Sequence, residues 1–246
     1  MYNDRPNPKI RKTIGIFHLN DPKQPCIERY NQIRTFYLST TTYIGVIKKL
    51  RKGRATKKRT AIIYNIETRN EWVVPTSLEA SRLAFSPDSK LLAIAGTEAS
   101  GIIQIWNIEK QRQTATIVAQ GGTQVQGLAL SSQGTIATTT RDRIILHRDK
   151  DPNYASHLAT NVWHIAFSPD ETFFIAFNHS KNCMEVRDGA TGELLQLLAH
   201  EDPTHSHSFE SGFAIAPDSR QVITSYIAGT IALWSFQPTD TYDIRS

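Results

Sequence analysis

Short apolar runs of four to six residues alternate with turn-forming residues along most of this chain. Clear examples are residues 91–95, 102–106, 173–177 and 231–234. Runs of this length, rich in β-branched and aromatic side chains and bounded by Gly, Pro, Asp or Ser, are typical of buried strands. No segment of useful length has the period of an amphipathic helix. The pattern therefore predicts an all-β protein built from antiparallel hairpins.

One hairpin pattern recurs along the chain. Leu83-Ala-Phe-Ser-Pro-Asp88 returns as Ile165-Ala-Phe-Ser-Pro-Asp170 and, altered, as Phe213-Ala-Ile-Ala-Pro-Asp218, with a weaker copy that begins at Leu128. Proline presets φ at the second turn position, and Ser or Asp bonds back to the turn backbone, so each copy predicts a hairpin turn. Two apolar runs flank each turn, and a third run follows them. This third run ends at residues 106, 147, 187 and 234 in the four copies, which are steps of 41, 40 and 47 residues. Three or four strands at this period are typical of propeller blades.

The repeats resemble WD repeats over about residues 33–237, most clearly from Arg82 onward. An aromatic residue ends the third strand at Trp106 and Trp234, and Asp188 matches the Asp that follows in the family. Ala199-His200 resembles the family's Gly-His. The resemblance implies an all-β, WD-repeat-like β-propeller of five to six blades with degenerate repeats, held together mainly by apolar packing between blades. The structural repeat positions would be Trp106, Trp234, Phe85, Phe167, His200 and Asp188.

The predicted organisation is a single β-propeller domain, residues 1–246. The blades are expected at residues 33–74, 82–118, 125–158, 162–198 and 209–237. Residues 13–32 are expected to supply N-terminal closing strands that pair with the last blade, because an unpaired strand edge would otherwise stay open. Five and six blades both remain open at this stage. So does an incomplete ring that a partner or a second copy completes by strand exchange.

Composition favours a soluble globular protein, with 39% hydrophobic and 21% charged residues. Cys26 and Cys183 lie far apart in no metal-binding spacing, which predicts free thiols and a cytoplasmic protein, or a nuclear one in a eukaryote. The net charge of +5 is uneven along the chain. Residues 1–60 hold 15 Lys and Arg against 3 Asp and Glu, whereas the remaining residues hold 13 against 20. The positive charge is therefore a local feature.

The strongest local charge lies in residues 48–60, predicted to be a basic loop insertion between two strands. Eight like charges in such a loop can seek phosphates or carboxylates, so nucleic acid, an acidic protein and no partner at all are alternatives. Few aromatic residues interleave with the charges, so contact with RNA or DNA would be independent of base sequence. The candidate anion- or nucleic-acid-binding residues are Lys48, Lys49, Arg51, Lys52, Arg54, Lys57, Lys58 and Arg59.

Catalytic chemistry has little support in the sequence. The Ser-Pro-Asp strings are turns, and the chain has no nucleophile elbow, no P-loop and no Cys with a nearby His. His200, His205 and His207 stand beside two carboxylates, but their spacing matches no closed zinc motif. His164 follows Trp163 on a strand and is expected to be a packed or channel-lining residue. We therefore expect no catalytic site, no metal and no cofactor.

The sequence as a whole predicts a non-enzymatic protein-interaction scaffold, a subunit of a larger intracellular assembly that contacts other proteins and no membrane. One alternative is an accessory nucleic-acid-binding subunit that grips phosphates through residues 48–59. A further alternative is a propeller enzyme or a metal-dependent sensor using the His200 loop. Fold alone identifies no partner.

Overall fold

The computed structural model contains only β-strands, turns and irregular segments in the residues that it describes. These are residues 16–18, 21–27, 33–38, 42–51, 57–98, 100–119, 124–148, 151–159, 161–199, 209–226 and 231–235. The all-β prediction is confirmed for this part of the chain. No helix within it is long and apolar enough to cross a membrane.

Five antiparallel sheets follow one another along the chain, each made of consecutive strands. The first contains β3 (Ile33–Leu38), β4 (Tyr43–Arg51), β5 (Lys57–Asn65) and β6 (Glu71–Val73). The second contains β7 (Ala80–Phe85), β8 (Leu91–Gly96), β9 (Ile102–Asn107) and β10 (Arg112–Val118). The third contains β11 (Gly127–Leu130), β12 (Ile136–Thr139), β13 (Arg143–Arg148) and β14 (Asp151–Leu158).

The last two sheets differ in size. The fourth contains β15 (Val162–Phe167), β16 (Phe173–Asn178), β17 (Cys183–Asp188) and β18 (Leu194–Leu198). The fifth contains only β19 (Phe209–Ile215), β20 (Gln221–Tyr226) and β21 (Ile231–Ser235), so β21 is an edge strand among the described residues.

The Ser-Pro-Asp strings form the tight turns that join the first two strands of a sheet. In the fourth sheet Ser168 Oγ donates to Asp170 Oδ1 at 2.7 Å, and the amide of Phe173 donates to Ser168 Oγ at 3.2 Å. These turns also link neighbouring sheets, because the Asp170 amide donates to Ser219 Oγ of the fifth sheet at 3.1 Å. The Asp88 amide makes the same bond to Ser132 Oγ of the third sheet at 3.2 Å. The repeated turn therefore sets both the hairpin and the spacing between sheets.

Apolar side chains fill the space between successive sheets. We call the face of each sheet that points toward the following sheet its leading face. On the leading face of the second sheet, Ile103 and Ile105 pack in one cluster with Leu128 and Leu130 of the third. The first and third sheets bury their leading faces in the same way. Burial on both faces explains why β8 and β16 read as nearly continuous apolar runs rather than as alternating ones.

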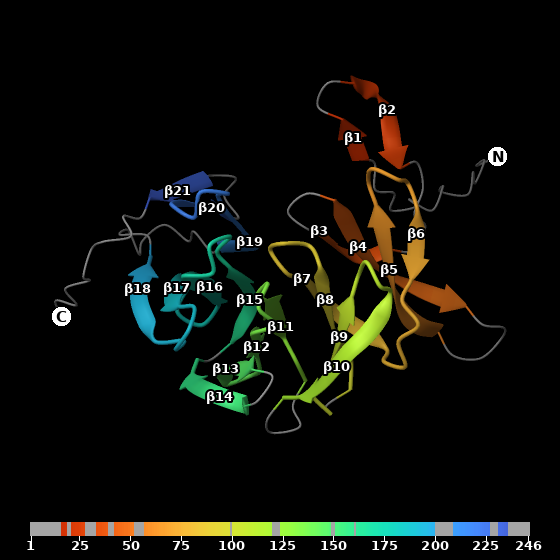
Figure 1. Ribbon diagram of the computed structural model, residues 1–246. Helices are drawn as coiled ribbons and strands as arrows, with labels where there is room; N and C mark the ends of the chain where they lie inside the picture. The colour runs from red at the N-terminus through yellow and green to blue at the C-terminus, as the bar shows by residue number, and fades with distance from the viewer. Residues whose placement is uncertain are drawn as a thin grey trace, which may run out of the picture.

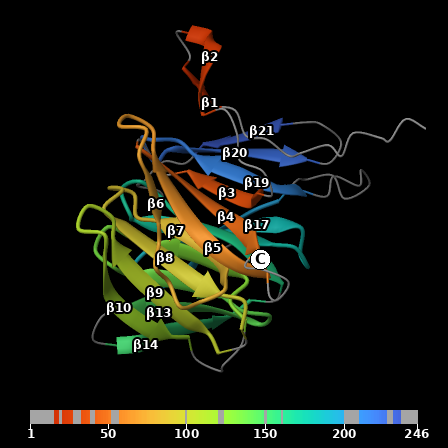
Figure 2. The same cartoon turned by 90° about the vertical axis from the view of Figure 1, so that its right-hand side faces the viewer.

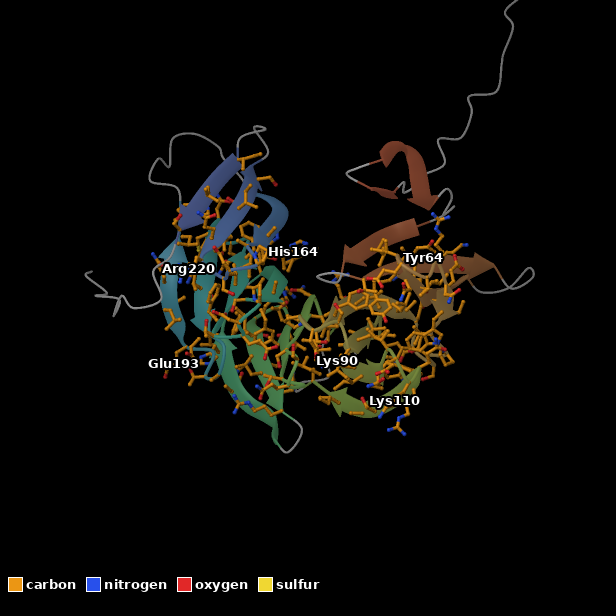
Figure 3. The ribbon with its side chains drawn as sticks, turned by 45° about the horizontal axis from the view of Figure 1, so that its top comes forward. Tyr64, Lys90, Lys110, His164, Glu193 and Arg220 are labelled. Atoms are coloured by element: carbon orange, nitrogen blue, oxygen red, sulfur yellow. The ribbon has the colours of Figure 1, made fainter. Side chains whose placement is uncertain are left out.

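The five sheets form an open arc with the fifth and the first at its two ends (Figures 1 and 3). The first strands of successive sheets face the inside of this arc, where β11 contacts both β7 and β15. The sheet order gives no strand shared between the fifth and first sheets among the described residues. The structure thus describes repeated sheets that do not close on themselves.

The N-terminal closing strands predicted at residues 13–32 lie partly outside the described residues, so their pairing with the last blade stays a prediction. β1 (Ile16–His18) and β2 (Asp21–Ile27) pair only with each other within the described residues. Figures 1 and 2 both show this hairpin standing apart from the five sheets. An irregular register interrupts its pairing at two places, which limits how far it can extend another sheet.

Candidate functional site

The basic segment is a strand pair over most of its length, which corrects the prediction of a loop insertion at residues 48–60. β4 continues to Arg51 and β5 begins at Lys57, with Lys49 opposite Arg59 and Arg51 opposite Lys57. The continued ladder satisfies backbone groups that a loop would leave to water. Lys52 and Arg54 lie outside the described residues. We call the paired residues 49–51 and 57–59 the basic arm.

The register divides the charges of this segment between two faces. Residues directly opposite in an antiparallel pair share a face, and successive residues alternate between faces. Lys49, Arg51, Lys57 and Arg59 therefore share one face, whereas Leu50 and Lys58 lie on the other. The four-cation face continues the leading face of the first sheet, because the Ile47–Ala61 pair lies two residues along the ladder from the Lys49–Arg59 pair and therefore on the same face.

Arg59 is the one member of that face whose side chain is described. It is half-buried, and its Nε lies 3.3 Å from Glu79 Oε1, close enough for an ion pair but without hydrogen-bond geometry. Glu79 directly precedes β7, so this contact lies where the second sheet begins to cover the first. Glu79 is the only carboxylate paired with Arg59 in the described part of the chain.

A second candidate surface is the leading face of the fifth sheet. Ile223, Ile231 and Leu233 are 42%, 69% and 62% exposed, and Ile223 lies directly opposite Leu233 in the ladder. The other face of the same sheet packs on the fourth sheet through Val222 and Trp234. Alternating burial along β21 therefore marks a sheet that is covered on one side only.

Equivalent positions in the other repeats are buried. Counting from the Ser-Pro-Asp turn and from the end of the third strand, Ile223 corresponds to Ile175, and Leu233 corresponds to Val186. Ile175 and Val186 are 0% and 2% exposed, since the fifth sheet covers them. Sequence reasoning missed this surface because an isolated repeat gives no sign of whether a following sheet is present.

Residues Trp163, His164 and His179 form an aromatic group at the inner end of the fourth sheet. The His179 ring centroid lies 5.8 Å from that of Trp163 and 6.2 Å from that of His164. Burial lowers the pKa of both histidines, and His179 and Arg82 lower that of His164 further. Figure 3 labels His164 on the fourth sheet and Tyr64 on the first, on opposite sides of the arc. Within the described residues neither histidine contacts a carboxylate that would orient it as a catalytic base.

The fourth sheet also holds a buried ion pair that the sequence did not predict. Arg187 donates through Nη2 to Glu185 Oε2 at 2.7 Å and through Nη1 to the Gly192 carbonyl at 2.8 Å. Asn178 donates to the other Glu185 oxygen at 2.8 Å. Both charged groups are hydrogen-bonded within the sheet, so this network is structural.

The repeat positions named from the sequence are mostly in the core. Trp106 and Phe167 are 5% and 9% exposed. Phe85 is partly buried against the cluster that contains Trp106, and Trp234 is partly buried against the cluster between the fourth and fifth sheets. Asp188 accepts hydrogen bonds from the Ala190 and Thr191 amides in the turn before β18, which is a turn-forming role. His200, His205 and His207 lie outside the described residues.

The described residues contain no group of three or more His, Cys, Asp or Glu side chains placed to hold a metal ion. Comparisons with known proteins add no assignment. No family model matches the chain, and no curated protein matches it.

Proposed function

We propose that this protein is a non-enzymatic interaction scaffold, a WD-repeat-like propeller subunit that works inside a larger intracellular assembly. The repeated Ser-Pro-Asp turns support the WD-like part of the proposal, as do Trp106 and Trp234, each next to the last residue of its strand, β9 or β21. The observation that carries the functional part is the uncovered leading face of the fifth sheet. Ile223, Ile231 and Leu233 are 42%, 69% and 62% exposed, so covering the exposed part of each would contribute roughly 3–5 kcal/mol in total at about 1.5–3 kcal/mol per fully buried side chain.

The occupant of this face is an apolar β-sheet face of another protein subunit, lying where a following sheet would lie. Each of the other four leading faces is covered by an apolar face of the next sheet, and the fifth is built on the same pattern. The described exposed residues of β20 and β21 carry no charge, so they offer no group that could form a salt bridge with a charged partner. Among the described strands none pairs with the outer edge of β21, and a partner strand can use the backbone groups of such an edge.

The experiment is affinity purification from native cells of the wild-type chain, an Ile231→Glu/Leu233→Glu variant and a Leu158→Glu control. Leu158 is an equally apolar residue that is 76% exposed on β14, away from the fifth sheet. A stoichiometric protein subunit should co-purify with the wild type and the control and be lost from the double variant. Cross-links from that subunit should map to the fifth sheet. Equal recovery by all three, or cross-links elsewhere only, would contradict the proposal.

A further inference from the structure

The basic arm has a register that costs stability in the isolated protein. Lys49 faces Arg59, and Arg51 faces Lys57, across the two strands. Like charges directly opposite in an antiparallel pair are destabilising, because the paired positions are only about 4.5–5.5 Å apart. Within the described residues Glu79 is the carboxylate that compensates one of these four cations. A ladder with this arrangement gains stability when an anion lies along its four-cation face.

The arm also projects beyond the other strands of its sheet. β3 pairs with β4 only as far as Lys48, and β6 pairs with β5 only from Ile62 onward. Among the described residues the arm is therefore two strands wide, and Figure 1 shows β4 and β5 reaching outward from the arc at this end. A narrow ribbon of this kind can approach a ligand that a broad sheet face could not.

We propose that the four-cation face of the basic arm binds the phosphate backbone of nucleic acid. Register positions on one face of a strand repeat every second residue, about 6.6–6.8 Å along the backbone, and the paired strand offers a second row of such positions. Phosphates along a nucleic-acid strand offer regularly spaced single charges to such rows. Lys and Arg contacts to phosphates also release counterions, so affinity requires no apolar contact.

The composition of the face favours phosphate over an acidic protein. Protein interfaces depend on aromatic and apolar side chains at their centre, and this face has none between residues 49 and 51 or between 57 and 59. Leu50 lies on the opposite face. Binding should be independent of base sequence, because the arm carries no aromatic side chain for stacking. This proposal is independent of the fifth-sheet surface.

The test compares two variants, each of which removes two positive charges from one face of the β4–β5 ladder. Arg51→Gln/Lys57→Gln changes the four-cation face, and Lys48→Gln/Lys58→Gln changes the other. Binding of the purified full chain is followed by fluorescence anisotropy with a labelled single-stranded oligonucleotide, the matching duplex and polyglutamate, across a salt series from about 50 to 200 mM. Thermal melting checks that each variant folds.

With three or more phosphate contacts, wild-type affinity for a single strand should fall with a log–log salt slope of about −2 or steeper. Arg51→Gln/Lys57→Gln should weaken binding about 25-fold at 0.1 M salt and flatten the slope by about 1.4. Lys48→Gln/Lys58→Gln should have a clearly smaller effect. Tighter binding of the single strand or of the duplex identifies which form of backbone the arm prefers.

Three results would overturn the proposal. Equal loss in both variants would mean general attraction to a basic segment and no role for the four-cation face. A wild-type slope shallower than about −1 would mean that phosphates are not the contacts. Polyglutamate bound as tightly as the oligonucleotides would point to an acidic protein instead.

Discussion

Replacing Arg187 with Met tests the buried ion pair of the fourth sheet. The guanidinium and carboxylate side chains are 7% and 1% exposed, and the shortest distance between Arg187 and Glu185 is 2.7 Å. The substitution keeps an unbranched chain of similar length but removes three hydrogen bonds, two to Glu185 and one to Gly192. Glu185 then keeps only Asn178 and the more distant Lys181, whose Nζ lies 3.7 Å away.

Breaking a buried pair from one side typically costs about 3–5 kcal/mol, because the remaining charge stays desolvated. For a chain of this size each kcal/mol lowers Tm by about 2–4 °C, so a fall of roughly 6–20 °C is expected. Glu185→Gln/Arg187→Met should cost less, about 1–2 kcal/mol, since Gln still accepts from Asn178 and leaves no buried charge. The second sheet carries Gln104 at the position equivalent to Glu185.

Urea unfolding followed by tryptophan fluorescence measures these differences, with Arg112→Met on the exposed part of β10 as the control. The control should lie within about 0.5 kcal/mol of the wild type. A cost below about 1 kcal/mol for Arg187→Met, or a double variant less stable than the single one, would contradict the burial of an unpaired Glu185 charge in the single variant. Either result would mean that water reaches the pair.

Three further predictions concern the core and its titration. Trp106→Ala should cost about 3–5 kcal/mol in urea unfolding, because the residue is buried between the first and second sheets. Gly189→Ala should cost about 1–3 kcal/mol in the same assay, since a Cβ there would lie 2.2 Å from the Glu171 carbonyl oxygen. The pKa values of His164 and His179 are lowered by burial, so the unfolded chain takes up protons first as the pH falls below about 6.5. Tm should therefore drop between pH 7 and pH 5, and drop less in His164→Asn/His179→Asn.

The hairpin turns were predictable because their chemistry is local. Ser168 and Asp170 are two residues apart, and their hydrogen bond needs nothing beyond the turn itself. The same holds for Ser86 and Asp88, where the side chains meet at 2.6 Å. Short apolar runs on either side of such turns then indicate strands, so the all-β class follows from the sequence.

The basic arm was predicted as a loop because charge dominates its composition. Lys has low β-propensity, and Gly53 in the middle suggests a loop. The structure instead continues the β4–β5 ladder to Arg51 and Lys57, since pairing in a hairpin propagates from the buried residues that precede it. Pairing between β4 and β5, which the composition of the segment does not reveal, sets the length of these two strands.

Two other features depend on contacts between repeats. Glu185 and Arg187 look like degenerate repeat positions in the sequence, and only their burial shows that they pair. Ile231 and Leu233 look like core residues, but they are 69% and 62% exposed, and no sheet in the described part of the chain follows the fifth. No property of a single repeat distinguishes a covered leading face from an uncovered one.

The most direct test of the uncovered fifth sheet is the rate of thiol labelling at Leu233→Cys in the purified protein, compared with Val186→Cys. Both variants are made in a Cys26→Ser background, and the native Cys183 is buried, with its pKa raised by burial and by Glu185, so it should react slowly. Leu233→Cys should react at the rate of an exposed thiol, and Val186→Cys far more slowly. Slow labelling at both positions would mean that the chain covers its own fifth sheet, which contradicts the account.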